Sequence, residues 1–238
     1  RWRKPALLGM LLCIAGVIGL WGIGFFAPEL VGDVITTSVR AEALRDAVAL
    51  SPEELEQKIS SQTAYYKGLN SIIQNIGAFF GMLAFSYLAQ RAGRKPAFVV
   101  AFIGAFIATN AYFQLFKSVD QLWMSGVMGF FQLALFAGFA IYLPELFPTR
   151  LRSTGTSFCY NVGRFLAATG PFTLGLLQQK LGESAMAKLP ETADAAAKAA
   201  AKLGAFREAT SWVSLVFILG LVVVFFLPET KGQPMPED

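Results

Sequence analysis

Long runs of apolar residues, separated by short basic clusters or by longer polar connections, dominate the pattern along the chain. A helix needs roughly 20 mostly apolar residues to cross the hydrocarbon layer of a membrane. Six runs have about this length, and they cover approximately residues 5–30, 68–89, 96–116, 121–143, 153–177 and 211–227. The pattern therefore predicts six transmembrane helices.

The basic clusters predict how these helices are oriented. "RWRK" precedes the first run, "QRAGRK" joins the second to the third, and "PTRLR" joins the fourth to the fifth. All three clusters fall on one side of the membrane, and Lys and Arg accumulate on the cytoplasmic side. We expect both ends of the chain to be cytoplasmic, in a multi-pass protein of the cell (inner) membrane. The connections 31–67 and 178–210 are then extracytoplasmic.

Both extracytoplasmic connections carry signals of water-exposed helices. Ser51 is followed by Pro52 and then by Glu54, three residues after Ser51, which is the signature of a capping box. In the second connection, "ADAAAKAAAKLG" has high helix propensity. We expect a short solvated helix at each place.

Composition agrees with a membrane protein and argues against other classes. The chain is 55% hydrophobic and only 15% charged, with a mean hydropathy of +0.52, which is outside the usual range for soluble domains. Its net charge of +4 follows the membrane topology, so we expect no nucleic-acid partner. Histidine is absent and the two cysteines lie in apolar runs, so we expect no enzyme activity, catalytic residue, metal or cofactor.

A weak repeat relates the two halves of the chain. The first run ends in "GIGFFAPEL" and the fourth in "GFAIYLPEL", so Pro28 and Glu29 correspond to Pro144 and Glu145. One copy ends on the outer side and the other on the inner side. This arrangement suits two inverted three-helix repeats, which are common in membrane carriers.

Three stretches carry a resemblance to a known family, namely "SYLAQRAGRKP", "PELFPTRLRSTG" and "PETKG". They resemble patterns of the major facilitator superfamily, in its sugar-porter and metabolite:proton symporter branches. The first departs from the family's loop pattern, because Ser86 stands in place of a Gly and Gln90 in place of an Asp. The missing carboxylate at position 90 weakens any charge clamp that would use it.

The resemblance implies an all-α integral membrane fold, a six-helix transmembrane bundle that forms one half of a twelve-span carrier. Residues 1–238 would be the carboxy-terminal transmembrane domain. The partner would be an amino-terminal six-helix half, in the same polypeptide or as a separate chain. Because the chain begins without Met, we expect a fragment of a longer carrier, with a half-size protein as the alternative.

Charged residues at the predicted cytoplasmic side suggest a gate. Pro144 and Pro148 end the fourth span, and Glu145 between them is expected to pair with Arg91, Arg150 or Arg152. Such pairs hold helices in one arrangement and release them in another; the alternative is a static anchor. The expected gate or clamp residues are Arg91, Arg94, Lys95, Glu145, Arg150 and Arg152.

Arg164 is the most informative residue, because it lies in the middle of an apolar run. Eleven residues separate it from Ser153, which places it roughly 16 Å into a hydrocarbon layer about 30 Å thick. An Arg at that depth costs about 2.5–3.5 kcal/mol unless it faces water or a partner. Tyr160 and Asn161 lie on the same helix face. We expect Arg164 to bind a carboxylate. The alternative is a permanent ion pair with an acidic residue, in this chain or in the partner half.

Other spans offer polar or aromatic groups at comparable depth. We expect Gln74, Asn75 and Gln132 to orient the substrate, although hydrogen bonds between helices are an equal alternative. Trp21 and Phe25 are expected to form an apolar wall. Glu29 is a possible coupling residue, since it is the one carboxylate of the chain near membrane depth. The resemblance likewise implies that the first, second, fourth and fifth spans line the pathway.

These features predict a secondary transporter that works by alternating access. Its expected substrate is a small organic anion such as a carboxylate, with transport coupled to an ion. Two alternatives stay open: a sugar or polyol transporter of the same fold, and a non-transporting membrane receptor or assembly module. The expected partners are the small-molecule substrate, the lipid bilayer and the amino-terminal half.

Overall fold

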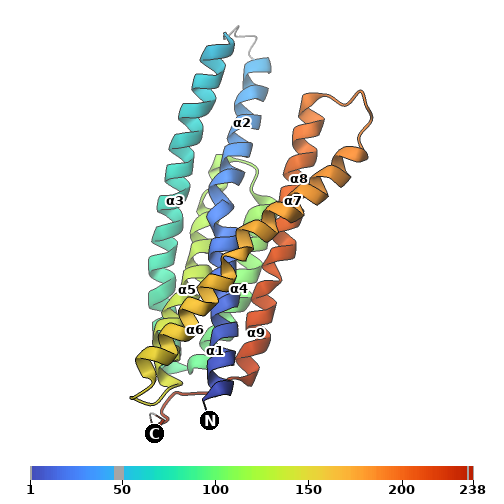
Figure 1. Cartoon of the computed structure of the whole chain (residues 1–238). Coiled ribbons are helices and arrows are strands. Elements are labelled where there is room, and N and C mark those ends of the chain that lie inside the picture. Colours follow the sequence, from blue (N-terminus) through green and yellow to red (C-terminus); the bar gives the residue numbers. More distant parts are fainter. Residues whose placement is uncertain (1, 46–50, 235, 238) are drawn as a thin grey trace.

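The computed structural model describes residues 2–45, 51–234, 236 and 237, and the regular structure in them is entirely helical. Helices α1 to α9, with three shorter turns η1 to η3, form six columns packed side by side (Figure 1). The bounds are α1 Arg3–Val17, η1 Ile18–Ile23, η2 Gly24–Phe26, α2 Ala27–Arg45, α3 Pro52–Arg91, α4 Arg94–Leu115, η3 Val119–Gln121, α5 Trp123–Glu145, α6 Arg152–Ala167, α7 Thr169–Ala187, α8 Ala195–Ser214 and α9 Val216–Phe226. The predicted helical membrane bundle is confirmed.

The columns are longer than the predicted spans. Helix α3 has 40 residues, or about 60 Å at 1.5 Å per residue, which is twice the thickness of a hydrocarbon layer. Much of the two predicted connections therefore continues the helices on either side of them, and the α2–α3 and α7–α8 pairs project from one end of the bundle (Figure 1). Residues 46–50 of the first connection lie outside the described residues.

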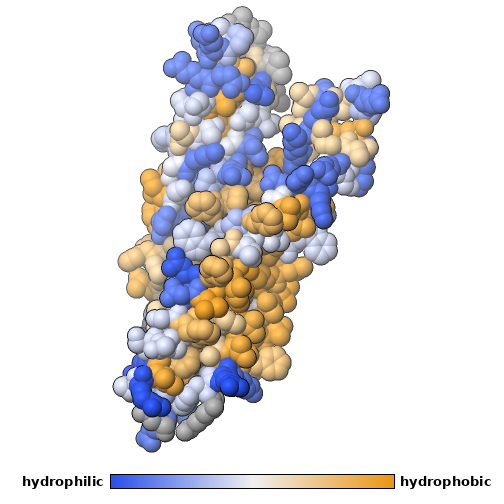
Figure 2. Space-filling model, viewed as in Figure 1, coloured by the Kyte–Doolittle hydropathy of each residue, from blue (hydrophilic) through white to orange (hydrophobic). Residues whose placement is uncertain are grey.

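Five helical segments in the described part are long and apolar enough to cross a membrane: Arg3–Ala43, Pro52–Arg91, Arg94–Leu115, Val119–Glu145 and Ala195–Phe226. The predicted span 153–177 is not among them. A break at Ala168 divides it into α6 and α7, and one face of α6 is polar. Apolar side chains gather over the middle of the bundle and hydrophilic ones at its two ends (Figure 2), as a membrane protein requires.

Local sequence signals explain where several helices begin. The predicted capping box at Ser51 is confirmed, since its backbone N–H donates to the Glu54 carboxylate over 2.8 Å and its hydroxyl accepts from the Glu54 N–H. The carboxylate of Asp194 caps α8 by accepting the N–H of Ala197 over 2.7 Å. Both caps satisfy backbone groups that a helix start leaves unpaired.

The first column is irregular at mid-height, where π-helical η1 and 3-10 turn η2 separate α1 from α2. Pro28 explains the position of the break, because a proline ring clashes with the carbonyl four residues earlier, here that of Gly24. The break matters for function because its residues line a pocket described below.

Candidate functional site

Arg164 lies on the polar face of α6 and is exposed. A neighbouring face of α6 packs on α1, where a Cβ at Gly163 would lie 2.8 Å from the Cβ of Cys13. The Arg164 guanidinium lies over the ring of Tyr160, 5.6 Å from its centroid, and Asn161 beside them is exposed. No ion pair of Arg164 is present within the described part of the chain. We call Tyr160, Asn161 and Arg164 the Arg164 face.

A second group of predicted residues meets in a pocket of about 560 Å³ between the break in the first column and α3. We call it the central pocket. The break and the start of α2 contribute Trp21, Phe25 and Glu29, and α3 contributes Gln74 and Asn75. The structure thus brings together two groups of predicted residues that lie more than 40 positions apart in the sequence.

The Arg164 face is not part of the lining of this pocket. The two sites are joined through a close contact of the first column with α7, since a side chain at Gly22 would lie 3.3 Å from the Cα of Gly170. Arg164 precedes Gly170 by six residues, or about 9 Å of helix. Glu29 follows Gly22 by seven residues in the opposite direction, so Arg164 and the Glu29 end of the pocket differ in depth by clearly more than about 9 Å.

Gln132 lies behind the wall of the central pocket. It is fully buried, and its Nε2 donates to the Thr109 hydroxyl over 2.9 Å. Its Oε1 has no hydrogen-bond partner in the structure and faces Gly24, a pocket residue. The sequence predicted either substrate orientation or hydrogen bonding between helices for Gln132. The contact to Thr109 is of the second kind.

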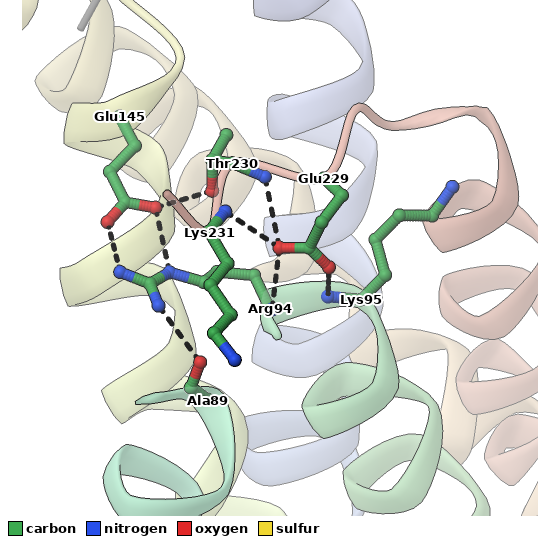
Figure 3. Close-up of polar contacts among 7 residues, drawn as sticks. All are labelled: Ala89, Arg94, Lys95, Glu145, Glu229, Thr230 and Lys231. Atoms are coloured by element: carbon green, nitrogen blue, oxygen red, sulfur yellow. Dashed lines mark hydrogen bonds and ion pairs between the residues drawn. The ribbon is translucent and has the colours of Figure 1, made fainter. Parts of the chain in front are cut away.

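A compact ionic network joins several helix ends (Figure 3). It includes the C-terminal segment, which lies at the opposite end of the bundle from the projecting pairs (Figure 1). Arg94 at the start of α4 makes a bidentate pair with Glu145 at the end of α5, with Nε to Oε2 at 3.0 Å and Nη2 to Oε1 at 2.6 Å. The same guanidinium donates to the Ala89 carbonyl over 2.9 Å. Glu145 thus pairs with Arg94 and not with Arg91 or Arg152, because the start of α4 brings Arg94 closer to it.

The C-terminal segment completes this network. The hydroxyl of Thr230 donates to Glu145, and the carboxylate of Glu229 accepts four backbone N–H groups over 2.9–3.0 Å, those of Arg94, Lys95, Thr230 and Lys231. Burial raises the pKa of Glu229, but the four N–H groups outweigh it, so the net pKa lies below the ordinary value. We call Arg94, Glu145, Glu229 and Thr230 the terminal clamp.

The other predicted gate residues have separate contacts. The Lys95 ammonium donates a hydrogen bond to the Phe225 carbonyl over 3.1 Å, and the Arg152 guanidinium donates one to the Pro144 carbonyl over 3.2 Å. The guanidinium of Arg91 lies over the ring of Tyr87 at 4.5 Å, and Arg150 is exposed in the turn before α6. The sequence analysis did not predict the contacts of Glu229 and Thr230. It identified the "PETKG" stretch that contains them only as part of the family resemblance.

With this geometry in view, comparison with known proteins is informative. Residues 56–237 match the family described as Sugar (and other) transporter. The chain belongs to this family, within the major facilitator superfamily. Membership of a transporter family agrees with the prediction that the chain is not an enzyme.

Individual relatives are more distant. The chain is 24% identical over 205 residues to a Haemophilus influenzae protein named for metabolite transport, covering 86% of this chain and 44% of the relative. It is 32% identical over 111 residues to a Cupriavidus pinatubonensis protein named for 4-methylmuconolactone transport, covering 46% and 26%. It is 30% identical over 125 residues to the cis,cis-muconate transport protein of Acinetobacter baylyi, covering 52% and 29%. The chain spans less than half the length of each of these relatives.

Proposed function

We propose that the chain is the carboxy-terminal transmembrane domain of a secondary transporter that carries a small organic anion, with Arg164 as the anion-binding residue. The observation that supports this most is an exposed guanidinium, far from both ends of its column, without an ion pair among the described residues. A cation at membrane depth needs water or an anionic partner. Substrate can provide that partner.

A carboxylate is the substrate group that we assign to Arg164. A planar guanidinium binds a carboxylate through two parallel, charge-assisted hydrogen bonds. Stacking on Tyr160 holds the guanidinium on the exposed side of α6, and the amide of Asn161 is available beside it. The name of the Acinetobacter relative also points to a carboxylate, because muconate is one.

Alternating access would require a second half that closes over the Arg164 face and the central pocket. We assign this role to an amino-terminal six-helix half and place both chain ends in the cytoplasm, in the cell (inner) membrane. The terminal clamp then acts as a cytoplasmic gate element, since a bidentate ion pair between two helix ends can form in one arrangement and break in another. Coupling to an ion is part of the same proposal.

Uptake into proteoliposomes that hold the full-length carrier tests this proposal. Labelled monocarboxylates, dicarboxylates and sugars are compared for the wild type and for Arg164→Gln. Loss of a bidentate charge-assisted pair should reduce carboxylate uptake on the order of 100-fold. Arg40→Gln is the matched control, because Arg40 forms an exposed surface pair with Glu56.

The other outcomes select the alternatives. Carboxylate uptake that Arg164→Gln leaves unchanged would end the role of Arg164. Uptake of sugars or polyols alone would favour a neutral substrate. Absence of all uptake, with correctly folded protein, would favour a receptor or assembly module.

A further inference from the structure

The central pocket combines aromatic rings with a carboxylate, which an anion site does not need. Trp21, Phe25 and Glu29 follow one another at intervals of four residues along the first column and line the same pocket. The two rings lie 5.9 Å apart between centroids at an interplanar angle of 34°, and they are 46% and 65% exposed. An accessible aromatic wall therefore leads to a carboxylate.

Glu29 shares the nearby Lys67 with a second carboxylate, that of Asp33. Asp33 lies one turn beyond Glu29, and Lys67 of α3 faces both, with its Nζ 3.1 Å from where a Cβ at Gly32 would be. No ion pair within 4 Å joins Glu29 or Asp33 to a base within the described ranges. Glu29 is therefore the carboxylate of the lining that remains available to a ligand.

The α3 wall of the pocket offers acceptors as well. The side-chain amide of Asn75 donates to the Ser71 carbonyl of its own helix over 2.8 Å, which leaves its oxygen available. Gln74 lies beside it in the lining. Aromatic faces, a carboxylate and amide oxygens are the groups that recognise alkylated ammonium ions.

We infer that the central pocket binds a cationic alkylammonium group of the substrate. This inference rests on the proposed function, because Arg164 would hold the carboxylate of the same molecule. The substrate class is then a zwitterion, an ammonium-substituted carboxylate.

The spacing of the two sites refines this class. Gly22 and Gly170 are at the same level because their backbones touch, and Arg164 lies about 9 Å of helix below that level. Glu29 lies seven residues beyond Gly22 on the other side of that level, and the long Arg164 and Glu29 side chains span part of the total distance. A molecule with several bonds between its ammonium and carboxylate groups fits better than an α-amino acid.

A pair of isosteric probes separates charge from shape. One is 4-(trimethylammonio)butanoate and the other is 5,5-dimethylhexanoate, in which carbon replaces the charged nitrogen. Uptake of both is measured with the full-length carrier in proteoliposomes for the wild type, Glu29→Gln and Trp21→Leu. Asp33→Asn is the control, since Asp33 is near the same lysine but is not part of the pocket lining.

The wild type should prefer the ammonium compound about tenfold, a ratio typical of a desolvated cation–π site with a carboxylate. Glu29→Gln should bring the two uptakes within about twofold of each other, and Trp21→Leu should lower the ratio about threefold. Asp33→Asn should leave most of the preference in place.

Three results would overturn the inference. Equal uptake of both probes by the wild type would show that the pocket does not recognise the positive charge. An unchanged preference of Glu29→Gln for the ammonium probe would show that Glu29 does not contribute to that recognition. A loss of pH-gradient-driven uptake in Glu29→Gln with the probe preference intact would make Glu29 a proton carrier instead. In each case, carboxylate uptake that still depends on Arg164 would leave the proposed function standing.

Discussion

The terminal clamp and the Arg164 face each contain an arginine in a helix of an apolar bundle, but the two arginines differ in whether the chain itself provides an ionic partner. Arg94 is 16% exposed in its side chain and satisfied by Glu145 and a backbone carbonyl. Arg164 is exposed, and its guanidinium lies over the ring of Tyr160. It forms no ion pair within the part of the chain that the structure describes. The first arginine completes a structure within the chain, whereas the second leaves its charge for a group outside it.

The same contrast separates the carboxylates. Glu229 accepts four backbone N–H groups, and Glu145 accepts a guanidinium and a hydroxyl. Glu29 lines a pocket without an ion pair among the described residues. Folding thus accounts for the charges at the terminal clamp, and ligand binding is the simplest account of those at the middle. The three predictions below test this division.

The largest effect is expected from breaking the ion pair of the terminal clamp. Arg94→Gln leaves the partly buried Glu145 without its guanidinium and should lower the free energy of unfolding in detergent by about 2–3 kcal/mol. Arg164→Gln removes no internal partner and should change it by less than about 0.5 kcal/mol.

A double-mutant cycle checks the assignment. Adding Glu145→Gln to Arg94→Gln should cost less than the sum of the two single changes, because the unpaired charge disappears. Equal losses for Arg94→Gln and Arg164→Gln would remove the distinction between the two arginines.

A smaller effect is expected at Gly93, where α4 begins. Its φ of 112° and ψ of 165° fall in a region that is essentially restricted to glycine, and a Cβ would lie 2.7 Å from the Glu229 carboxylate. Gly93→Ala should cost about 1–3 kcal/mol, measured by the same unfolding experiment. Gly68→Ala is the control: its site in α3 has nothing within 4 Å of a Cβ, so a gain of about 0.5–1 kcal/mol is expected. A neutral Gly93→Ala would mean that the loop relaxes.

The smallest effect is expected from neutralising Glu229. Glu229→Gln keeps the shape but loses a charge-assisted cap at the α4 N-terminus, at a cost of about 1 kcal/mol near pH 7. The pKa of Glu229 is lowered from 4.5 by folding, so the ionised form stabilises the fold above about pH 4.5 and this contribution fades as the pH falls through the lowered pKa.

Unfolding measured from pH 8 to pH 3 checks the sign. The difference between wild type and Glu229→Gln should be constant down to about pH 5 and shrink below that. A difference that grows at low pH would contradict the proposed capping role.

Local features of the chain were accessible from the sequence. Hydrophobic run length predicted the bundle, and the Ser51–Glu54 spacing predicted a helix start that the structure confirms. Helical spacing placed Tyr160, Asn161 and Arg164 on one face of α6. In the structure, the buried residues Cys159, Gly163 and Ala167 lie on a different face of that helix. These features depend on neighbours within a few turns of one helix, so the order of residues determines them.

Tertiary structure decided everything that depends on distance between helices. It chose Arg94 over Arg91 and Arg152 as the partner of Glu145, brought Glu229 onto the start of α4, and placed Gln132 behind the pocket wall on Thr109. It also separated Arg164 from the central pocket. Helix tilt, the break at Gly24–Phe26 and close glycine contacts set these distances, and a one-dimensional pattern of polar and apolar residues does not contain them.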